Sequence, residues 1–180
     1  MTTNYYTGSN FSLTGFEKAD FVRCMKDWNN NETSTHYLVT GLFPVTEGGL
    51  EKIFDDNAKE GNVVFAITHN GKIVGSTGLY RINWQSRHAE FRILIGDNSV
   101  YNMGIGTAVC KYLVSYAFDR LNMNKVWLGV NEENKGAVRS YEKAGFKLEG
   151  KLRDELFRNG RYYDILRMSI LKDEYEKQKV

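Results

Sequence analysis

The sequence predicts a single α/β domain built on one mixed β-sheet. The 180 residues fit one ordinary globular domain, with little room for a second. Hydrophobic residues make up 42% of the chain, which is enough to bury a sizeable core. Segments with strand-like alternation and segments with helical spacing follow one another along the chain. Because hairpins give antiparallel pairs and helical crossovers give parallel pairs, we expect the sheet to contain both.

Charge and cysteine content argue against several classes of protein. The formal net charge is only +2, without the basic bias typical of proteins that bind nucleic acids or membrane surfaces, so we expect neither partner. No apolar run reaches the roughly 18 residues of a membrane span, and the first residues lack a secretory signal. Cys24 and Cys110 have no partner at a metal-ligand spacing. Two isolated thiols indicate a reduced, cytoplasmic protein without a metal site.

The first third of the chain predicts one strand and two helices. Alternating residues over 11–16 indicate a short strand, and apolar residues over 17–28 share one helical face. The three asparagines at 29–31 end this helix, and a polar stretch follows. A second helix begins after Thr46, which is a plausible N-cap.

The middle of the chain predicts three strands. The apolar run at 63–67 is followed by Asn70-Gly71, the strongest local signal for a hairpin, and then by a strand that ends near Tyr80. Residues 89–95 alternate again and form the third of these strands.

The last third alternates helices with strands. A long helix begins at the glycines of 104–106 and ends at about Leu121, and a short buried strand covers 125–130. A second helix covers 135–144 and ends at Gly145, a natural C′ residue.

The C-terminal segment predicts a second hairpin. Asn159-Gly160 joins two long strands, 146–158 and 161–171, and the charged tail could add a final helical turn. The whole chain therefore predicts about seven strands and about four helices.

The segment over 93–107, Ile-Leu-Ile-Gly-Asp-Asn-Ser-Val-Tyr-Asn-Met-Gly-Ile-Gly-Thr, leads from a strand through a loop into a helix. Gly104 and Gly106 stand where the helix begins. Glycines at this point let a ligand approach the unpaired amides of the helix N-terminus, where phosphate oxygens bind well. A plain tight turn would explain the same glycines.

A second informative segment covers 131–146. Asn134 and Tyr141 are seven positions apart, which places them on nearly the same face of a helix, roughly 10 Å from each other. An amide and a phenol would then line one groove. Alternatively, Asn134 caps the helix and Tyr141 packs in the core.

Together, these segments resemble the GCN5-related N-acetyltransferase (GNAT) superfamily. Residues 101–106 are similar to its Q/R-x-x-G-x-G/A motif, and 131–146 to its more specific run N-E-x-N-x-x-A-x-x-x-Y-x-x-x-G-F. Residues 83–91 and the hairpin containing Gly160 resemble the branch that acetylates ribosomal-protein N-termini, spermidine and nucleotide-linked amino sugars. The resemblance covers 11–171.

The resemblance implies one GNAT-like domain over 1–180 with its core over about 11–171, a β-bulge or splay between two central strands, and acetyl-CoA as cosubstrate without a metal. Tyr101 replaces the usual Gln or Arg, and Asn102 replaces a common glycine, so the backbone amides are left to hold the pyrophosphate. The implied cofactor-binding residues are Ile93, Leu94, Ile95, Tyr101, Asn102, Met103, Gly104, Ile105, Gly106, Thr107 and Asn134.

The implied reaction moves an acetyl group from acetyl-CoA to a primary amine by direct attack. The amine must lose a proton and the coenzyme thiolate must gain one. The resemblance assigns the base to Glu90, directly or through water, and the acid to Tyr141. The residues themselves leave a structural role open for Glu90, which could face solvent or pair with Arg87 or Arg92.

The amine acceptor is harder to predict. Acidic residues in the first helical region, Glu32, Glu47 and Glu51, would suit a polycation such as spermidine, although charges on helices are usually a solvated face. Aromatic residues could line an acceptor pocket or belong to the core. The acceptor could be a polyamine, a protein N-terminus or an amino sugar, and the candidate substrate-binding residues are Trp28, Glu32, Tyr80 and Trp84.

Other functions stay open from the sequence alone. The same fold could bind acyl-CoA as a noncatalytic sensor, although the retained Glu90 and Tyr141 argue against it. A nucleotide-phosphate-binding protein of unrelated chemistry is a third hypothesis. His88 is more typical of a surface residue than of a base, and Cys110 of a core thiol than of a nucleophile. A homo-oligomer is compatible with the sequence.

Overall fold

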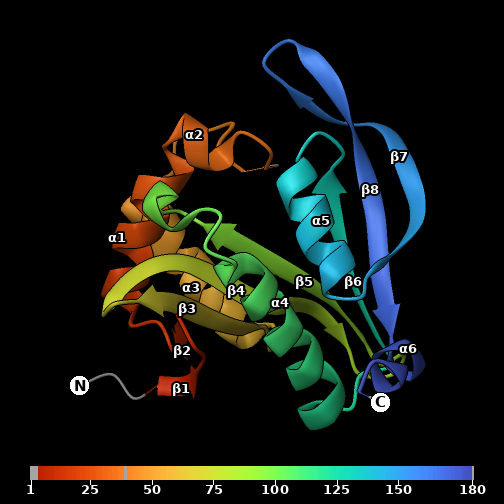
Figure 1. Ribbon diagram of the computed structural model, residues 1–180. Helices are drawn as coiled ribbons and strands as arrows, with labels where there is room; N and C mark the ends of the chain where they lie inside the picture. The colour runs from red at the N-terminus through yellow and green to blue at the C-terminus, as the bar shows by residue number, and fades with distance from the viewer. Residues whose placement is uncertain (1–3, 39, 180) are drawn as a thin grey trace. The chain divides into compact units, whose positions relative to one another are not determined.

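A computed structural model of the chain describes residues 4–38 and 40–179 (Figure 1). The described residues form eight strands and six α-helices, and the strands are hydrogen bonded in the order β1-β2-β3-β4-β5-β6-β8-β7. Both antiparallel and parallel neighbours occur, which confirms the predicted mixed α/β fold. The described residues group into two compact units, and the assignment of a single domain over the whole chain stays a prediction.

The first unit contains residues 4–38, 40–78 and Ile93–Ile105. Its strands β1 (Asn4–Thr7), β2 (Ser12–Thr14) and β3 (Val63–His69) pair in antiparallel fashion. The strand expected at 11–16 is therefore present as β2, but β1 was not predicted. Most of β1 is exposed, so it carries none of the alternation that marks a half-buried strand.

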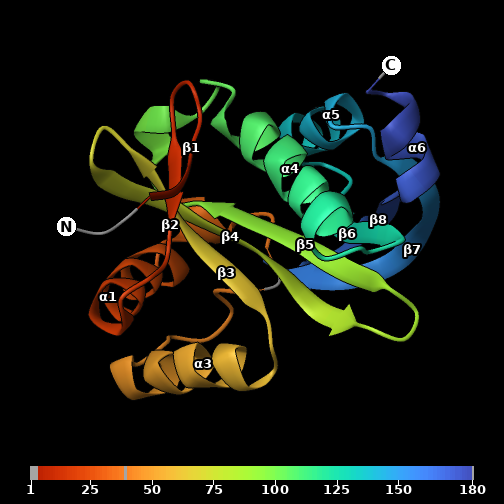
Figure 2. The same cartoon turned by 90° about the horizontal axis from the view of Figure 1, so that it is seen from below.

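The predicted helices of the first unit are present as α1 (Lys18–Asn29) and α3 (Glu47–Lys59). They lie side by side next to β3 (Figure 2) and share a core of Phe21, Val22 and Leu50. Thr46 caps α3 as expected, since its hydroxyl accepts a hydrogen bond from the Gly49 amide at 3.2 Å.

A four-residue helix, α2 (Glu32–Thr35), lies in the stretch that was expected to be irregular. Asn31 caps it by accepting hydrogen bonds from the amides of Thr33 and Ser34. A single helical turn buries too few apolar residues to produce a periodic pattern, which explains why the sequence did not indicate it.

Strands β4 (Lys72–Asn83) and β5 (His88–Ile95) contribute residues to both units. The predicted hairpin before β4 is confirmed, with Asn70 and Gly71 at φ values of 50° and 77°. In the first unit the end of β5 is fixed by close packing. A Cβ atom on Gly96 would lie 2.1 Å from the ring of Trp28, so only glycine fits there.

The second unit contains Leu79–Arg92 and residues 106–179. The start of β5 pairs in parallel with β6 (Lys125–Asn131), and the pairing covers His88–Glu90 and Lys125–Trp127. Parallel pairing was expected where a helix joins two strands, and the helix that begins at Ile105 joins β5 to β6. The splay of the two strands beyond this pairing stays a prediction, because the last residues of β5 belong to the first unit.

The C-terminal hairpin of the second unit also agrees with the sequence. Strand β8 (Arg161–Leu171) pairs with β6 on one side and with β7 (Lys147–Arg158) on the other. Asn159 and Gly160 form the predicted turn, both with positive φ.

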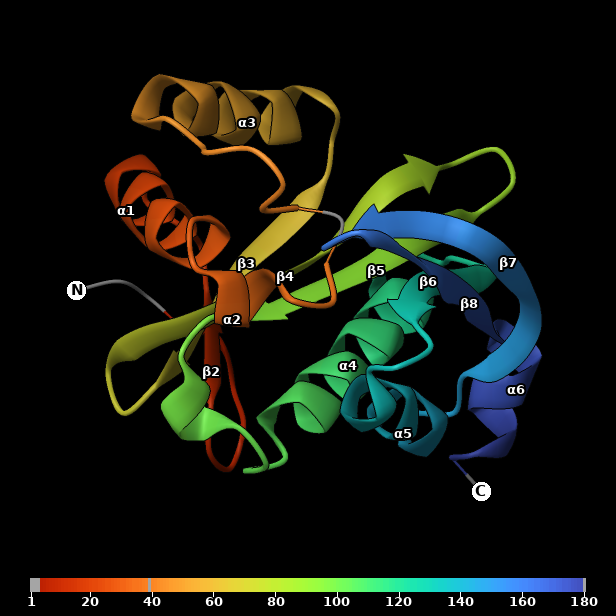
Figure 3. The ribbon, with the colours of Figure 1, turned by 90° about the horizontal axis from the view of Figure 1, so that it is seen from above.

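The helices of the second unit are α4 (Ile105–Ser115), α5 (Lys135–Lys143) and α6 (Lys172–Lys177). A π-helical turn over Tyr116–Arg120 continues α4, so the long helix ends where it was expected. Helices α4 and α5 are neighbours (Figure 3). None of the helices in the described part of the chain is long and apolar enough to cross a membrane.

Candidate active site

The loop between β5 and α4 is shaped by its own polar groups. The Asp97 carboxylate accepts a hydrogen bond from the Ser99 amide at 2.9 Å and so caps a 3₁₀ turn over Asn98–Val100. Hydrogen bonds from the side chain and the amide of Ser99 hold the pKa of Asp97 below its ordinary value. Val100 is buried and anchors the turn. This part of the loop therefore has a defined conformation before any ligand binds.

Tyr101 fastens the same loop to the strand before it. Its hydroxyl donates a hydrogen bond to the Ile95 carbonyl oxygen at 3.1 Å. Partial burial raises the pKa of the phenol above its ordinary value, which keeps the proton in this bond. The side chain that stands in place of the family's Gln or Arg therefore holds the loop against β5.

The two loop glycines leave open space at the start of α4. Gly104 has a φ of 77°, in the left-handed region that favours glycine. A Cβ atom on Gly104 or Gly106 would meet no atom of the described residues within 4 Å, apart from the local backbone. Packing therefore does not require glycine at position 106. The space lies beside the free amides of a helix N-terminus, and this arrangement fits the pyrophosphate of acetyl-CoA.

Two other predicted residues lie in the first unit. Trp28 is 9% exposed and packs on Gly96, next to the half-buried strand end Ile93–Ile95. Glu32 is exposed in the first turn of α2. Their roles in substrate binding stay predictions.

Glu90 lies in the second unit and is held by two arginines. Its side chain is 13% exposed, and one carboxylate oxygen lies 2.7 Å from the Arg92 guanidinium and 3.5 Å from that of Arg81. The pairing with Arg92 is one of the two structural alternatives that the sequence left open. The general-base role of Glu90 stays a prediction, and the arginines would orient the carboxylate for it.

The aromatic residues near Glu90 differ in their surroundings. The Arg92 guanidinium lies over the ring of Tyr80, 4.8 Å from its centre. Burial raises the pKa of Tyr80 to about 12. Trp84 is 61% exposed in the turn between β4 and β5. A largely exposed indole is available to a ligand, whereas the phenol of Tyr80 is mostly enclosed.

Tyr141 lies on α5, within the aromatic packing of the second unit. Its ring centre is 6.1 Å from those of Phe91 and Phe146. Burial raises the pKa of its phenol well above the ordinary value, and Cys110 adds to the effect. The hydroxyl is therefore protonated at neutral pH, as a general acid must be.

Asn134 caps α5, which is the structural reading left open by the sequence. Its side-chain oxygen accepts a hydrogen bond from the Ala137 amide at 3.1 Å. The cap uses the oxygen, so the amide nitrogen still has its two protons for a ligand. Capping and cofactor binding are therefore compatible at this residue.

Asn131 is a buried polar residue that was not predicted to belong to the site. This residue ends β6 and is 2% exposed, and its side-chain oxygen accepts a hydrogen bond from the Glu133 amide. Its side-chain nitrogen is buried without a partner among the described residues, as is Nδ1 of the half-buried His88. The only available signal was the position of Asn131 at the start of the N-E-x-N run.

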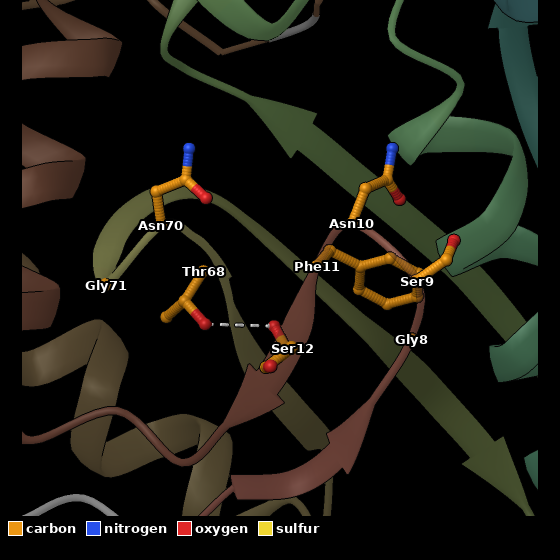
Figure 4. A pocket seen from close by; sticks show the side chains of 8 residues that line it. All are labelled: Gly8, Ser9, Asn10, Phe11, Ser12, Thr68, Asn70 and Gly71. Carbon is orange, nitrogen blue, oxygen red and sulfur yellow. Dashed lines mark hydrogen bonds between the residues drawn. The ribbon is translucent and has the colours of Figure 1, made fainter.

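A polar pocket of about 200 Å³ lies elsewhere in the first unit (Figure 4). It is lined by Gly8, Ser9, Asn10, Phe11, Ser12, Thr68, Asn70 and Gly71. The lining residues include the hydroxyls of Ser9, Ser12 and Thr68 but no Asp, Glu, His, Lys or Cys side chain that could activate them. Over the residues that the structure describes, no group of three or more His, Cys, Asp and Glu could hold a metal ion.

Comparisons with known proteins identify the family. A family profile described as an acetyltransferase (GNAT) domain matches residues 10–147. The chain belongs to the GNAT acetyltransferases. It is an acetyl-CoA-dependent N-acetyltransferase, as its relatives indicate. The spermidine N(1)-acetyltransferase of Vibrio cholerae is 35% identical over 170 residues, which cover 93% of this chain and 96% of the relative.

Other relatives belong to the same family. A spermidine N(1)-acetyltransferase of Escherichia coli K12 is 37% identical over 62% of this chain and 59% of its own. A putative ribosomal N-acetyltransferase of Bacillus subtilis is 34% identical over 63% of this chain and 61% of its own. The crystal structure of the V. cholerae enzyme in complex with CoA and spermine has a TM-score of 0.86 at 31% identity, covering 94% of this chain and 99% of that one.

Gly106→Val tests the cofactor loop of this N-acetyltransferase. The residue has no positive φ and no close neighbour, so we expect the variant to fold with nearly unchanged stability. Its side chain would occupy the space left for phosphate, and we expect CoA affinity to fall at least about tenfold, equivalent to roughly 1.4 kcal/mol. Isothermal titration calorimetry with CoA measures this, with Gly15→Ala as a control at another unobstructed glycine. Unchanged affinity in a folded Gly106→Val protein would contradict the assignment.

Proposed function

We propose that the acetyl acceptor is a polyamine of the spermidine or spermine type. The supporting observation is the 35% identity to a spermidine N(1)-acetyltransferase over 93% of the chain. The relative with a TM-score of 0.86 is described in complex with CoA and spermine. Similarity over nearly the full length of both chains includes the helices before β3, where acceptor-binding residues were expected.

The acidic residues of the first helical region, Glu32, Glu47 and Glu51, are all exposed. Glu47 accepts a hydrogen bond from Lys26 at 2.8 Å, and this bond lowers the pKa of the Glu47 carboxyl. Its side chain still keeps 65% of its surface exposed. We therefore assign the electrostatic attraction of a polycationic acceptor to this acidic region as a whole.

In the proposed mechanism, the carboxylate of Glu90 removes a proton from the acceptor ammonium, directly or through a water molecule. The neutral amine then attacks the thioester carbonyl, and backbone amides of Ile93–Ile95 polarise that carbonyl. Arg92 and Arg81 hold the carboxylate in one orientation. The carbon–sulfur bond of the thioester breaks as the new amide forms, and the attacking nitrogen gives up its second proton to solvent water.

Tyr141 then supplies a proton or a hydrogen bond to the departing thiolate. Its raised pKa keeps the phenol protonated throughout the neutral range. A thiol has an ordinary pKa of roughly 8.5, below that of the phenol, so complete proton transfer is uphill. We therefore infer that Tyr141 acts mainly by donating a hydrogen bond as negative charge develops on sulfur.

The proposal also covers the cellular compartment and the oligomeric state of the protein. Both cysteines are buried as free thiols, which supports a reducing, cytoplasmic environment. One solved structure of the V. cholerae enzyme, with a TM-score of 0.82 and 30% identity, is described as dodecameric. We propose a homo-oligomer for this chain as well, and a monomeric mass in sedimentation experiments would contradict it.

An acceptor panel tests the proposed function. Release of free CoA from acetyl-CoA is measured with spermidine, spermine, an N-terminal peptide of a ribosomal protein, an amino sugar and amino acids. We expect kcat/KM to be highest with the polyamines. Preference for a peptide or a sugar would contradict the polyamine assignment. Binding of acetyl-CoA without turnover of any amine would indicate the noncatalytic sensor instead.

Glu90→Gln tests the general base. Glutamine keeps the shape of the side chain and can accept hydrogen bonds from Arg92 and Arg81, but it cannot take up a proton. We expect kcat/KM for the amine to fall by roughly 10²–10⁴-fold in steady-state assays. Glu149→Gln on β7, which removes the ion pair with Lys125 of β6, is the control and is expected to leave the rate unchanged. A Glu90→Gln enzyme with nearly the parent activity would show that the residue is structural.

Tyr141→Phe tests the general acid. The ring stays in its contacts with Phe91 and Phe146, so the fold and the affinity for acetyl-CoA are expected to change little. Loss of the hydroxyl is expected to lower kcat by about 100-fold, the lower end of the range for general acids, because thiolates leave fairly well unaided. Tyr175→Phe on α6 is the control. An unchanged kcat, with chemistry shown to be rate-limiting, would make Tyr141 a packing residue only.

A further inference from the structure

A chain of hydrogen bonds in the first unit connects the β3–β4 turn with the cofactor loop. The side-chain nitrogen of Asn70 lies 3.1 Å from Nε2 of His69, and Nδ1 of His69 lies 2.6 Å from the backbone carbonyl oxygen of Asn10. The side-chain nitrogen of Asn10 donates a hydrogen bond to the carbonyl oxygen of Met103 at 3.0 Å. Figure 4 shows Asn10 and Asn70 on the two turns that border the polar pocket.

The chemistry of these groups determines the direction of each bond. A carbonyl oxygen can only accept, so Nδ1 of His69 carries the proton that is shared with Asn10. Nε2 of the neutral ring then accepts from the Asn70 amide. Asn10 is thus fixed through its backbone to β3, while its side chain reaches a residue 93 positions away in the sequence. A neighbouring contact also joins this segment to β3, since the Thr68 hydroxyl donates a hydrogen bond to the Ser12 carbonyl oxygen.

The bond to Met103 determines the direction of one loop amide. The Met103 carbonyl and the Gly104 N–H belong to the same planar, trans peptide, so they point in opposite directions. Glycine at 104 offers little resistance to rotation of that peptide plane. A hydrogen bond that holds the carbonyl toward Asn10 therefore directs the Gly104 amide away from Asn10.

We propose that Asn10 is a positioning residue for coenzyme binding. By holding the Met103 carbonyl, it keeps the Gly104 N–H directed at the pyrophosphate of acetyl-CoA. Asn10 does not touch the coenzyme in this role and acts only through the peptide of Met103 and Gly104. The inference rests on the assignment of the loop as the pyrophosphate site, and it adds a residue from a remote turn to that site.

Asn10→Leu removes the donor at nearly constant size. Loss of one hydrogen bond is expected to raise the dissociation constant of CoA about 3- to 10-fold in calorimetry. In turnover assays, kcat/KM for acetyl-CoA is expected to fall by the same factor. For acetyl-pantetheine, which lacks the pyrophosphate, kcat/KM is expected to be unchanged. This difference separates positioning of the loop from a general loss of structure.

Asn10→Asp and Asn4→Asp form a matched pair on the same N-terminal hairpin. Asp at position 10 cannot donate to Met103 and adds a negative charge beside the loop, so CoA affinity is expected to fall further than in Asn10→Leu. The side chain of Asn4 donates a hydrogen bond to the nearby Thr7 hydroxyl, and the Asn4→Asp variant is expected to bind CoA as the parent does. The Asp variants also provide the test if the leucine variant does not fold.

Three results would overturn the inference. The first is parent-like CoA affinity in both Asn10 variants. The second is an equal loss with acetyl-CoA and acetyl-pantetheine, because that would show a general structural effect. The third is failure of the parent protein to bind CoA, which would overturn the loop assignment as well. The first two results would leave the proposed N-acetyltransferase reaction intact.

Discussion

Attraction between backbone amides and phosphate oxygens is the interaction on which the proposed chemistry depends. A backbone N–H group, unlike a side chain, cannot be reoriented by a change of rotamer. The loop that carries these N–H groups must therefore itself be held in place. Tyr101 holds it at the Ile95 carbonyl, and Asn10 holds it at the Met103 carbonyl. Gly104 and Gly106 keep the space beside the amides free of side chains. The proposed binding of the coenzyme thus depends on a loop that Tyr101 and Asn10 hold in place.

The two proposed catalytic groups are distinguished by their surroundings. Glu90 lies beside two guanidinium groups, which suit a carboxylate that must stay oriented. Tyr141 lies among aromatic rings, where burial disfavours the phenolate and raises the pKa. In the proposed mechanism, Glu90 is thus the acceptor of a proton and Tyr141 a neutral donor. The ion pairs of Glu90 and the ring contacts of Tyr141 also stabilise the second unit, so structural and chemical roles coincide at both residues.

In the proposed function, the acceptor is attracted by a different part of the chain from the one that carries out the chemistry. The N-acetyltransferase relatives include enzymes named for spermidine and one named for ribosomal substrates, at similar identities over the shared segment. A relative that is 35% identical and matches over 96% of its own length is a spermidine enzyme. Exposed Glu32, Glu47 and Glu51 precede β3, outside the cofactor loop and α5. A change of acceptor could therefore arise in the first helical region while the transfer chemistry is retained.

Local patterns in the sequence were sufficient wherever one short segment determines its own conformation. Both Asn-Gly turns, the Thr46 cap and the glycine loop before α4 were predicted for this reason, and the family motifs then indicated the activity. Strand β1 and helix α2 were not predicted, because they bury too little surface to leave a periodic signal. The pairing of Glu90 with Arg81 and the bond from Asn10 to Met103 join residues that only the folded backbone brings together. Such contacts leave no local pattern, so the tertiary structure alone decided how the cofactor loop is held.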